Sequence, residues 1–187
     1  IYVGYKYYET RYEDVVTERQ NAGSYNYADT VLYPFGYGLS YTTFEWKNFD
    51  AKVENDTVKI SIDIKNVGGK AGKEVVQIYF QSEYTDFDKQ NGIEKSAVNL
   101  VEFAKTEIIE PNGSETVNME FPLTDMKVYD AKTNKTYILE QGDYYITAAN
   151  NAHAAVNNIL AAKGVASNKL VGAGDKDLVF KHEQRET

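Results

Sequence analysis

Cysteine is absent from this 187-residue sequence, and proline and histidine are scarce, with three and two copies. Without cysteine the chain forms no disulfide, no thiolate metal site and no cysteine nucleophile. The absence leaves the cellular compartment open, because secreted domains without disulfides are also common. Functions that rest on sulfur chemistry are therefore excluded.

The sequence also lacks a long apolar run and an excess of basic residues. Crossing a bilayer as a helix takes about 20 consecutive apolar residues, and no stretch approaches that length. The net charge of −8 and the pI near 4.9 create a field that repels nucleic acid and anionic lipid. We therefore predict a globular protein with no nucleic-acid or membrane partner.

Tyrosine is abundant instead, with 16 copies, of which ten lie in the first 41 residues. The stretch Tyr33–Trp46 has six aromatic residues among fourteen. Pro34, Gly36 and Gly38 interrupt any helix and weaken any strand there. We predict a rigid, irregular connector whose rings press against a neighbouring structure.

The segments before the connector give weaker signals. Residues 1–12 alternate imperfectly and are rich in β-formers, which predicts a strand. Residues 13–32 are polar and contain many turn formers, which predicts a long surface loop. Because the chain opens as if in the middle of a strand, we expect it to be part of a longer polypeptide.

After the connector the sequence alternates regularly. Val58, Ile60, Ile62 and Ile64 alternate with polar residues, which predicts a strand with one buried face. The turn 111–114 between two alternating segments predicts a hairpin. The expected strands cover about 44–53, 58–65, 76–80, 98–109, 117–123, 128–129, 137–139 and 144–149, with a longer excursion over 82–96. About seven strands without long helices between them predict a mainly β, antiparallel two-sheet sandwich.

The C-terminal part contains one helix candidate, at 152–163. Its apolar stripe includes Val156 and Ile159, Asn150 or Asn151 can cap its start, and Gly164 can end it. We expect this short helix to pack on the sandwich. Residues 165–187 have little pattern, which predicts a partly ordered tail or the beginning of further chain.

No group of residues satisfies the demands of a known reaction. A glycosidase needs two carboxylates about 5–9.5 Å apart in a pocket. The acidic pairs occur among polar residues and are predicted to be solvated surface charges, and they are Glu13–Asp14, Asp86 with Asp88, and Asp175 with Asp177. His153 and His182 are far apart in sequence and are predicted to be structural. We therefore expect no catalytic, metal-binding or cofactor-binding residue in this chain.

The tyrosines leave two interpretations open. Exposed tyrosine rings stack on sugar faces, which would indicate a carbohydrate-binding module. Burial against a neighbouring domain would instead make the same residues interface anchors. We favour interface packing because the aromatic residues are concentrated where the backbone is constrained.

The residues of the connector also resemble a known family. Residues 33–44, Y-P-F-G-Y-G-L-S-Y-T-T-F, closely resemble the segment that joins the catalytic α/β domain of glycoside hydrolase family 3 enzymes to their C-terminal fibronectin type III-like domain. Further similarity to that family lies in residues 1–8, which look like the last strand region of the α/β domain, and in residues 72–79, 100–114 and 140–145, which look like strands and turns of the fibronectin-like domain.

The resemblance implies a domain organisation. Residues 1–41 would be an incomplete terminal strand, loop and connector from the α/β domain. Residues 42–150 would form a fibronectin type III-like, immunoglobulin-like β-sandwich, and residues 151–187 a helix and tail. The family's catalytic Asp and Glu lie in domains outside this chain. The resemblance therefore implies an inert part of a retaining β-glucosidase or β-xylosidase.

The partner implied is the α/β catalytic domain of the same polypeptide. The residues expected to pack on it are all aromatic, and they are Tyr5, Tyr33, Phe35, Tyr37, Tyr41 and Phe44. The alternatives are a carbohydrate-binding or cell-surface adhesion module that binds an oligosaccharide or polysaccharide, and an adhesion or scaffolding sandwich unrelated to any enzyme.

Overall fold

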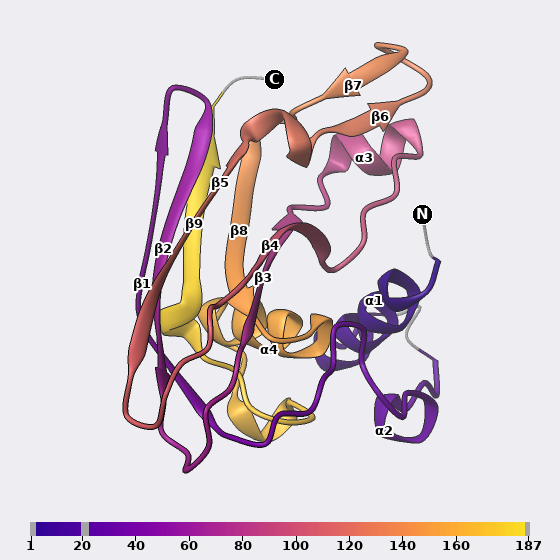
Figure 1. The fold of residues 1–187 in the computed structure, drawn as a ribbon. Helices are drawn as coiled ribbons and strands as arrows, with labels where there is room; N and C mark the ends of the chain where they lie inside the picture. The colour runs from indigo at the N-terminus through magenta and orange to yellow at the C-terminus, as the bar shows by residue number, and fades with distance from the viewer. Residues whose placement is uncertain (1–2, 20–22, 186–187) are drawn as a thin grey trace.

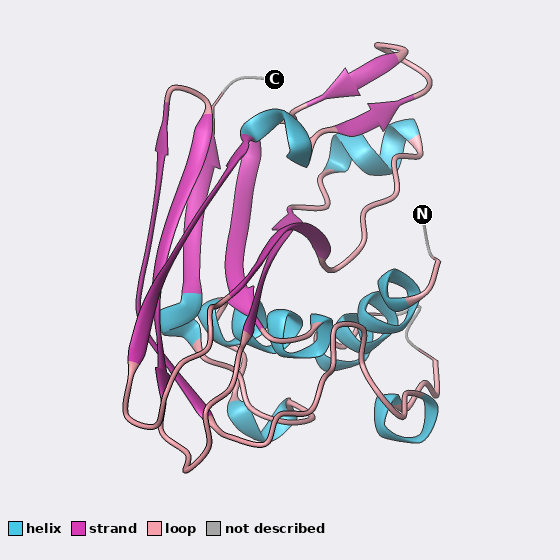
Figure 2. Ribbon diagram, in the orientation of Figure 1, coloured by secondary structure: helices cyan, strands magenta, loops and turns pink. Residues whose placement is uncertain are grey.

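Two antiparallel sheets face each other in the computed structural model, which describes residues 3–19 and 23–185 (Figures 1 and 2). One sheet has the strand order β1-β2-β5 and the other the order β4-β3-β8-β9. The bounds are β1 Phe44–Glu54, β2 Thr57–Asn66, β3 Val75–Ser82, β4 Asn99–Lys105, β5 Ser114–Pro122, β8 Gly142–Ala149 and β9 Val179–Gln184. This arrangement confirms the predicted mainly β, two-sheet sandwich.

The core between the sheets comes from the alternating residues of the sequence. Ile62 and Ile64 of β2 are fully buried, as are Val76 and Ile78 of β3. These side chains belong to one buried cluster that also contains residues of β5 and β8. Each buried aliphatic side chain contributes about 1.5–3 kcal/mol before chain entropy is subtracted. The hydrophobic pattern therefore fixes which face of each strand points inward.

The four-stranded sheet is covered on its second face by helices. Helix α4, Ala152–Ala162, packs on β8, and helix α1, Tyr5–Val16, packs beside α4 (Figure 1). The Asn151 side chain caps α4 by accepting a hydrogen bond from Ala154 N, and Gly164 follows its end with φ +84°. The predicted C-terminal helix is confirmed. No helix within residues 3–19 and 23–185 has the length and apolar character to span a membrane.

The prediction of a strand over residues 1–12 is wrong for the residues that the structure describes, and Ile1 and Tyr2 lie outside them. The segment forms helix α1, which also replaces the start of the loop predicted over 13–32. The buried residues Glu9, Tyr12, Glu13 and Val16 stand at i, i+3, i+4 and i+7, the spacing of one helix face. Because this face contains both charged and apolar residues, the helical period does not show as a hydrophobic pattern in the sequence.

The predicted hairpin around residues 111–114 is also wrong. Strand β4 pairs with β3, whereas β5 pairs with β2, so the chain crosses from one sheet to the other between them. Asn112 turns there with φ +65°, and its backbone N–H donates to Asn66 O at 2.9 Å. The turn residues at 111–114 belong to a crossing between the two sheets. Hairpins and such crossings use the same turn-forming residues, so the sequence did not distinguish them.

The tail is more ordered than the sequence predicted. Strand β9 pairs antiparallel with β8, from Gly142 opposite Gln184 to Thr147 opposite Val179. Phe180 of this strand packs against the sandwich core. Only two apolar residues, Val179 and Phe180, begin the strand, which is too short a run to predict from periodicity alone.

The remaining elements are short. Helix α2 is Tyr27–Thr30, and the excursion over 82–96 contains helix α3, Asp86–Asn91. Strands β6, Val128–Asp130, and β7, Thr136–Ile138, confirm the two weak strands and form a separate hairpin above α3 (Figure 1). Three 3₁₀ turns complete the fold, at Leu123–Met126, Ser167–Lys169 and Lys176–Leu178.

Asn66 joins the edges of this sandwich. Its side chain is fully buried at the end of β2. Its amide nitrogen donates to Lys70 O at 2.7 Å and to Ile109 O at 2.8 Å. Its Oδ1 accepts from Gly68 N at 3.0 Å and from Thr42 Oγ1 at 2.6 Å. One amide therefore ties the connector, the 66–72 turn and the crossing between the sheets.

We expect Asn66→Ala to lower the free energy of unfolding by about 3 kcal/mol, because several buried groups lose their partner at once. Asn66→Asp keeps the shape but removes both amide donors, so a similar loss is expected. Asn118→Ala on the exposed side of β5 is the matched control and should change stability by less than about 0.5 kcal/mol. Urea unfolding measures all three. Equal stabilities of the Asn66 and Asn118 variants would contradict this role.

Candidate interdomain surface

The connector, residues 33–43, is irregular in structure and places apolar side chains on the surface. It runs below α4 from α2 to β1 (Figure 1). Tyr33 is 65% exposed and Tyr41 is 98% exposed. Phe35, Tyr37 and Leu39 are exposed as well. This backbone confirms the predicted irregular connector, and large apolar side chains left in water need an explanation.

The connector backbone is held firmly although its side chains are exposed. Gln77 of β3 donates through Nε2 to Gly36 O at 3.1 Å and to Asn150 O at 2.8 Å. Phe35 O accepts a hydrogen bond from Ala152 N, the first residue of α4, at 2.9 Å. The connector is therefore fixed to the sheet and to the start of α4.

Helix α1 extends the exposed rings of the connector. Tyr5 stacks on Phe35 with 4.5 Å between ring centroids, and its hydroxyl accepts a hydrogen bond from Leu100 N at 3.0 Å. Tyr33 stacks on Tyr37 at 5.1 Å. A groove of about 440 Å³ lies between residues 4–9 and residues 30–35. The stacked rings therefore hold one another in place.

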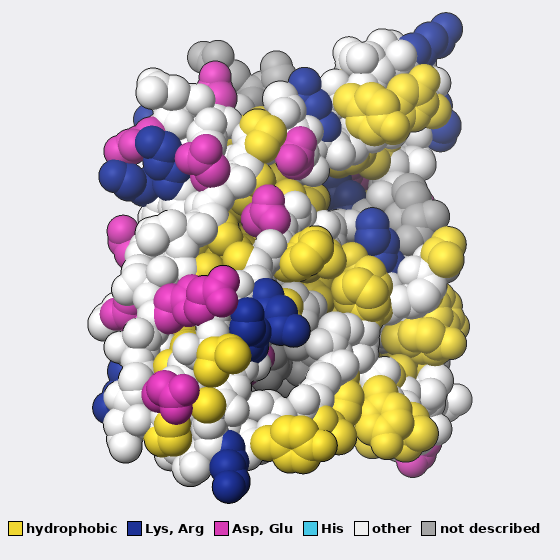
Figure 3. Space-filling model, viewed as in Figure 1, with side chains coloured by type: hydrophobic (Ala, Val, Ile, Leu, Met, Phe, Trp, Pro, Cys, Tyr) yellow, Lys and Arg dark blue, Asp and Glu magenta, His cyan; other side chains and the backbone are white. Residues whose placement is uncertain are grey.

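We call these exposed apolar residues the aromatic face. Hydrophobic side chains gather over this part of the molecule at the lower right of Figure 3. The members come from α1, the connector and the residues just before each of them, and they are Val3, Tyr7, Tyr8, Leu32, Tyr33, Phe35, Tyr37, Leu39 and Tyr41. Large exposed apolar patches often mark interaction sites in folded proteins.

A buried polar network holds α1 and α2 in place beneath this face. Glu9 is 1% exposed and accepts a hydrogen bond from the Tyr27 hydroxyl at 2.6 Å. His153 Nδ1 lies 2.9 Å from Glu9 Oε2, and its Nε2 lies 2.7 Å from Val171 O. Burial, together with the hydrogen bond to Glu9, raises the pKa of Tyr27 far above its ordinary value. His153 is thus a structural residue, as predicted.

The six aromatic residues predicted to pack on a partner do not share one environment. Tyr33, Phe35, Tyr37 and Tyr41 lie on the aromatic face, and Tyr5 lies half-buried beside them. The Phe44 side chain packs against the core of the sandwich. Its place at the start of β1 therefore gives Phe44 a contact within this chain.

The prediction of solvated surface charges is wrong for Glu13, Asp14 and Asp88 and confirmed for Asp86, which is exposed. Glu13 and Asp14 are buried on α1, and Asp88 is fully buried in α3. The expectation is confirmed for the exposed Asp175 and Asp177. Cationic neighbours make the burial possible: for example, Lys95 Nζ lies 2.6 Å from Asp88 Oδ2. Segment composition alone did not indicate these distant partners.

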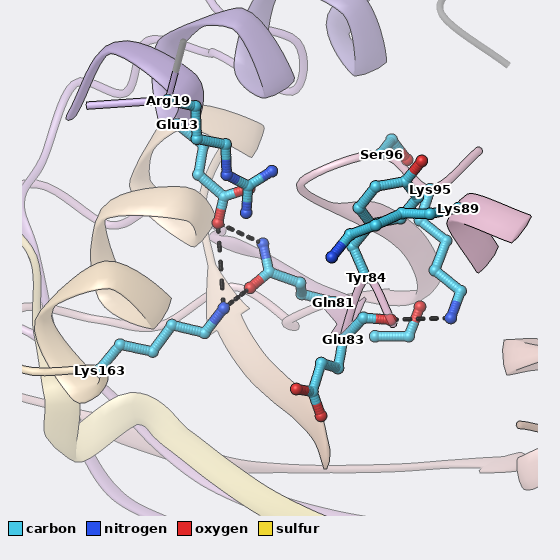
Figure 4. A pocket seen from close by; sticks show the side chains of 10 residues that line it. Glu13, Arg19, Gln81, Glu83, Tyr84, Lys89, Lys95, Ser96 and Lys163 are labelled. Carbon is cyan, nitrogen blue, oxygen red and sulfur yellow. Dashed lines mark hydrogen bonds and ion pairs between the residues drawn. The ribbon is translucent and has the colours of Figure 1, made fainter. Parts of the chain in front are cut away.

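Glu13 borders a polar pocket of about 500 Å³ between the ends of α1, α4 and β3 (Figure 4). Gln81 Nε2 donates to Glu13 Oε1 at 2.9 Å, and Lys163 donates to Gln81 Oε1. Arg19 Nη1 lies 3.3 Å from Asp14 Oδ1. Burial lowers the pKa of Lys163, and the Glu13 carboxylate opposes that shift. The lysine and arginine side chains of this pocket each lie near a carboxylate.

Among the residues that the structure describes, no three His, Asp or Glu side chains are arranged to hold a metal ion. The sequence reasoning missed several members of the aromatic face, namely Val3, Tyr7, Tyr8, Leu32 and Leu39. A helical period over residues 5–16 would have placed Tyr7 and Tyr8 away from the buried stripe.

Comparison with known proteins finds similarity over most of the chain. Residues 74–152 match the family of fibronectin type III-like domains. A β-glucosidase of Kluyveromyces marxianus is 35% identical over 164 residues, which cover 87% of this chain and 16% of that protein. A β-glucosidase of Ruminococcus albus is 33% identical over 159 residues, covering 83% of this chain and 14% of that protein.

A solved structure gives the same result. β-Glucosidase 3B of Thermotoga neapolitana, solved with α-D-glucose, superposes with a TM-score of 0.63 at 32% identity. The match covers 81% of this chain and 18% of that chain. The present chain thus spans a small part of the length of each of these relatives.

We expect Gly36→Ala to displace the connector and to lower the free energy of unfolding by about 2 kcal/mol. Gly36 has φ +85°, and an added Cβ would lie 2.1 Å from Gln77 Oε1. Gly38→Ala is the control, because nothing lies within 4 Å of its added Cβ. Thermal unfolding measures stability, and amide exchange of residues 33–41 measures connector order. Unchanged exchange in Gly36→Ala would contradict the proposed attachment.

Proposed function

Since residues 74–152 form a fibronectin type III-like domain of the kind found in the C-terminal part of glycoside hydrolase family 3 β-glucosidases, we propose that this chain is a non-catalytic accessory part of such an enzyme. Its role is to pack against the catalytic α/β domain of the same polypeptide and to stabilise it. The parent reaction would be hydrolysis of O-glycosyl bonds by a retaining β-glucosidase or β-xylosidase type of enzyme.

The aromatic face carries this proposal. Its members are exposed apolar side chains, yet the backbone beneath them is fixed by Gln77, Gly36 and Ala152. A rigid backbone that exposes stacked rings loses little entropy when a partner covers it. Aromatic side chains are also the residue type that most often anchors protein interfaces. The surface therefore fits a protein partner of fixed shape.

The buried carboxylates support a non-catalytic role. Glu9 accepts from Tyr27 and faces His153, Glu13 accepts from Gln81, and Glu140 lies 2.7 Å from Lys95 Nζ. A glycosidase acid or nucleophile must instead face a sugar-sized space with its oxygens free to react. These carboxylates serve the packing of the helices and of α3.

The similar β-glucosidases support the identity proposed for the partner. This chain covers 16% of the Kluyveromyces marxianus protein and 18% of the Thermotoga neapolitana chain. The remainder of such a polypeptide is large enough to contain the catalytic domains. A neighbour in the same polypeptide has a high effective concentration, so a modest apolar contact suffices to keep it docked.

The test compares the 187-residue chain with the full polypeptide that contains it. We expect amides of residues 31–41 to exchange about tenfold or more slowly in the full polypeptide, because the docked domain excludes water from them. The double variant Tyr33→Ser/Tyr37→Ser should remove this protection and lower the Tm of the full polypeptide. The same variant should leave the Tm of the 187-residue chain nearly unchanged. Hydrogen exchange mass spectrometry and calorimetry measure both quantities.

Tyr129→Ser/Tyr137→Ser is the matched control, since these residues are also an exposed tyrosine pair, 51% and 64% exposed. It should leave the protection of residues 31–41 intact. Equal exchange in the two polypeptides would refute docking. Hydrolysis of an aryl β-glucoside by the purified 187-residue chain would refute the non-catalytic assignment.

A further inference from the structure

A second groove lies between helix α1 and the β6–β7 hairpin. Its volume is about 410 Å³, within the roughly 300–1,000 Å³ that is usual for small-ligand pockets. Its floor is apolar and includes Phe80, Ile93 and Met126. Its rim holds polar and aromatic groups, among them Lys6, Asn99, Lys127, Tyr129 and Tyr137. We call it the hairpin groove.

Two tyrosines form one wall of the hairpin groove. Tyr129 and Tyr137 are directly opposite each other in the β6–β7 register, with their rings edge to face at 5.2 Å. About half of each residue is exposed. Two neighbouring rings with exposed surface offer ring faces on which the C–H face of a pyranose ring can stack.

The hairpin is held rigidly although it is short. Asp130 is fully buried, and its carboxylate accepts from the backbone N–H groups of Lys132, Thr133 and Asn134 at 2.9–3.0 Å. Burial opposes ionisation, but these N–H groups lower the pKa of Asp130. Thr133 Oγ1 donates to Asn91 Oδ1 of α3 at 2.6 Å. The tyrosine pair is therefore preorganised.

Two cationic groups of the groove lack a counter-ion, namely Lys6 of α1 and Lys127, which lies two residues before Tyr129. Among residues 3–19 and 23–185, no carboxylate lies within ion-pair distance of Lys6 or Lys127. Lys6 is half-buried, and burial lowers its pKa. A desolvated ammonium without a partner is costly, and a bound anion removes that cost. This lysine is unusual in a chain with a net charge of −8.

Asn99 adds a neutral donor to the same groove. Its Oδ1 accepts from Ser96 Oγ at 2.9 Å, whereas its amide nitrogen has no acceptor among the described residues. By contrast, Lys95 is already neutralised by Asp88 and Glu140. The carboxylate of Glu94 also lines the groove, and Glu94 has an interaction of its own. The remaining groups are two ammonium groups, one amide donor and two ring faces.

We propose that the hairpin groove binds a saccharide that carries a carboxylate, that is, a uronic acid residue. The tyrosine rings stack on the sugar ring, Lys6 and Lys127 bind its carboxylate, and Asn99 donates to a ring hydroxyl. A neutral sugar would leave Lys6 without a counter-ion, and a simple anion would leave the ring platform unused. This inference rests on residues outside the aromatic face, so it stands or falls separately from the proposed docking.

Binding is tested with the 187-residue chain and sodium glucuronate, digalacturonate, cellobiose and acetate. Isothermal titration calorimetry and chemical shifts of Asn99 and the Lys6 side chain report binding. We expect a uronate to bind about tenfold or more tightly than cellobiose or acetate, because only the uronate uses both the tyrosine rings and the ammonium groups. Salt should weaken uronate binding, as for any exposed ion pair.

Variants identify the groups. Tyr137→Ala and Lys6→Met should each weaken uronate binding about tenfold. The conservative Tyr129→Phe/Tyr137→Phe variant keeps the rings and should retain it. Tyr33→Ala/Tyr37→Ala and Lys70→Met are matched controls away from the groove and should retain it too; circular dichroism confirms that each variant folds.

Three results would overturn the proposal. The first is the absence of uronate binding, which would leave the tyrosine pair as a surface for another protein. The second is cellobiose binding as tightly as a uronate, which would make the groove a neutral-sugar site. The third is acetate binding as tightly as a uronate, which would reduce it to a simple anion site.

Discussion

The side-chain amide of Gln77 joins three parts of this molecule, the four-stranded sheet, the connector and the start of α4. It lies on the helix-covered face of β3, where its nitrogen donates to the connector and to the residue before the α4 cap. Its side-chain oxygen, Oε1, accepts a hydrogen bond from the Tyr79 hydroxyl at 2.6 Å. A buried amide of this kind must satisfy its bonds in one geometry. The four-stranded sheet therefore fixes the position of the connector, which carries part of the aromatic face.

Polar contacts between secondary-structure elements continue across the helical layer. Tyr12 donates to Asn157 Oδ1 at 2.7 Å, and Ala97 N donates to Thr10 Oγ1 at 2.9 Å. The inner core between the sheets is aliphatic, whereas the outer layer combines alanine and tyrosine packing with such bonds. Hydrophobic burial drives association but does not choose an orientation. The polar bonds orient α1, and with it the exposed tyrosines.

The sequence predicted the parts of this fold that depend on local periodicity. The strand with Ile60 and Ile62, the cap at Asn151 and the irregular connector all follow from spacing or backbone preference. It could not predict α1, because the stripe of Glu9, Tyr12 and Glu13 is polar and is stabilised by partners more than 60 residues away. The choice of sheet for β4 and β5 likewise depends on long-range pairing.

Two exposed tyrosine pairs show how neighbours decide what a surface recognises. Tyr33 and Tyr37 stand among Leu32, Leu39 and other apolar side chains, so water released from this area favours a broad apolar partner. Tyr129 and Tyr137 instead border unpaired lysines and an amide donor in a groove of ligand size. A flat apolar protein surface would remove water from those ammonium groups without giving them a hydrogen-bond acceptor or a counter-ion, which is unfavourable. Identical ring chemistry therefore favours a protein domain at one site and a small polar ligand at the other.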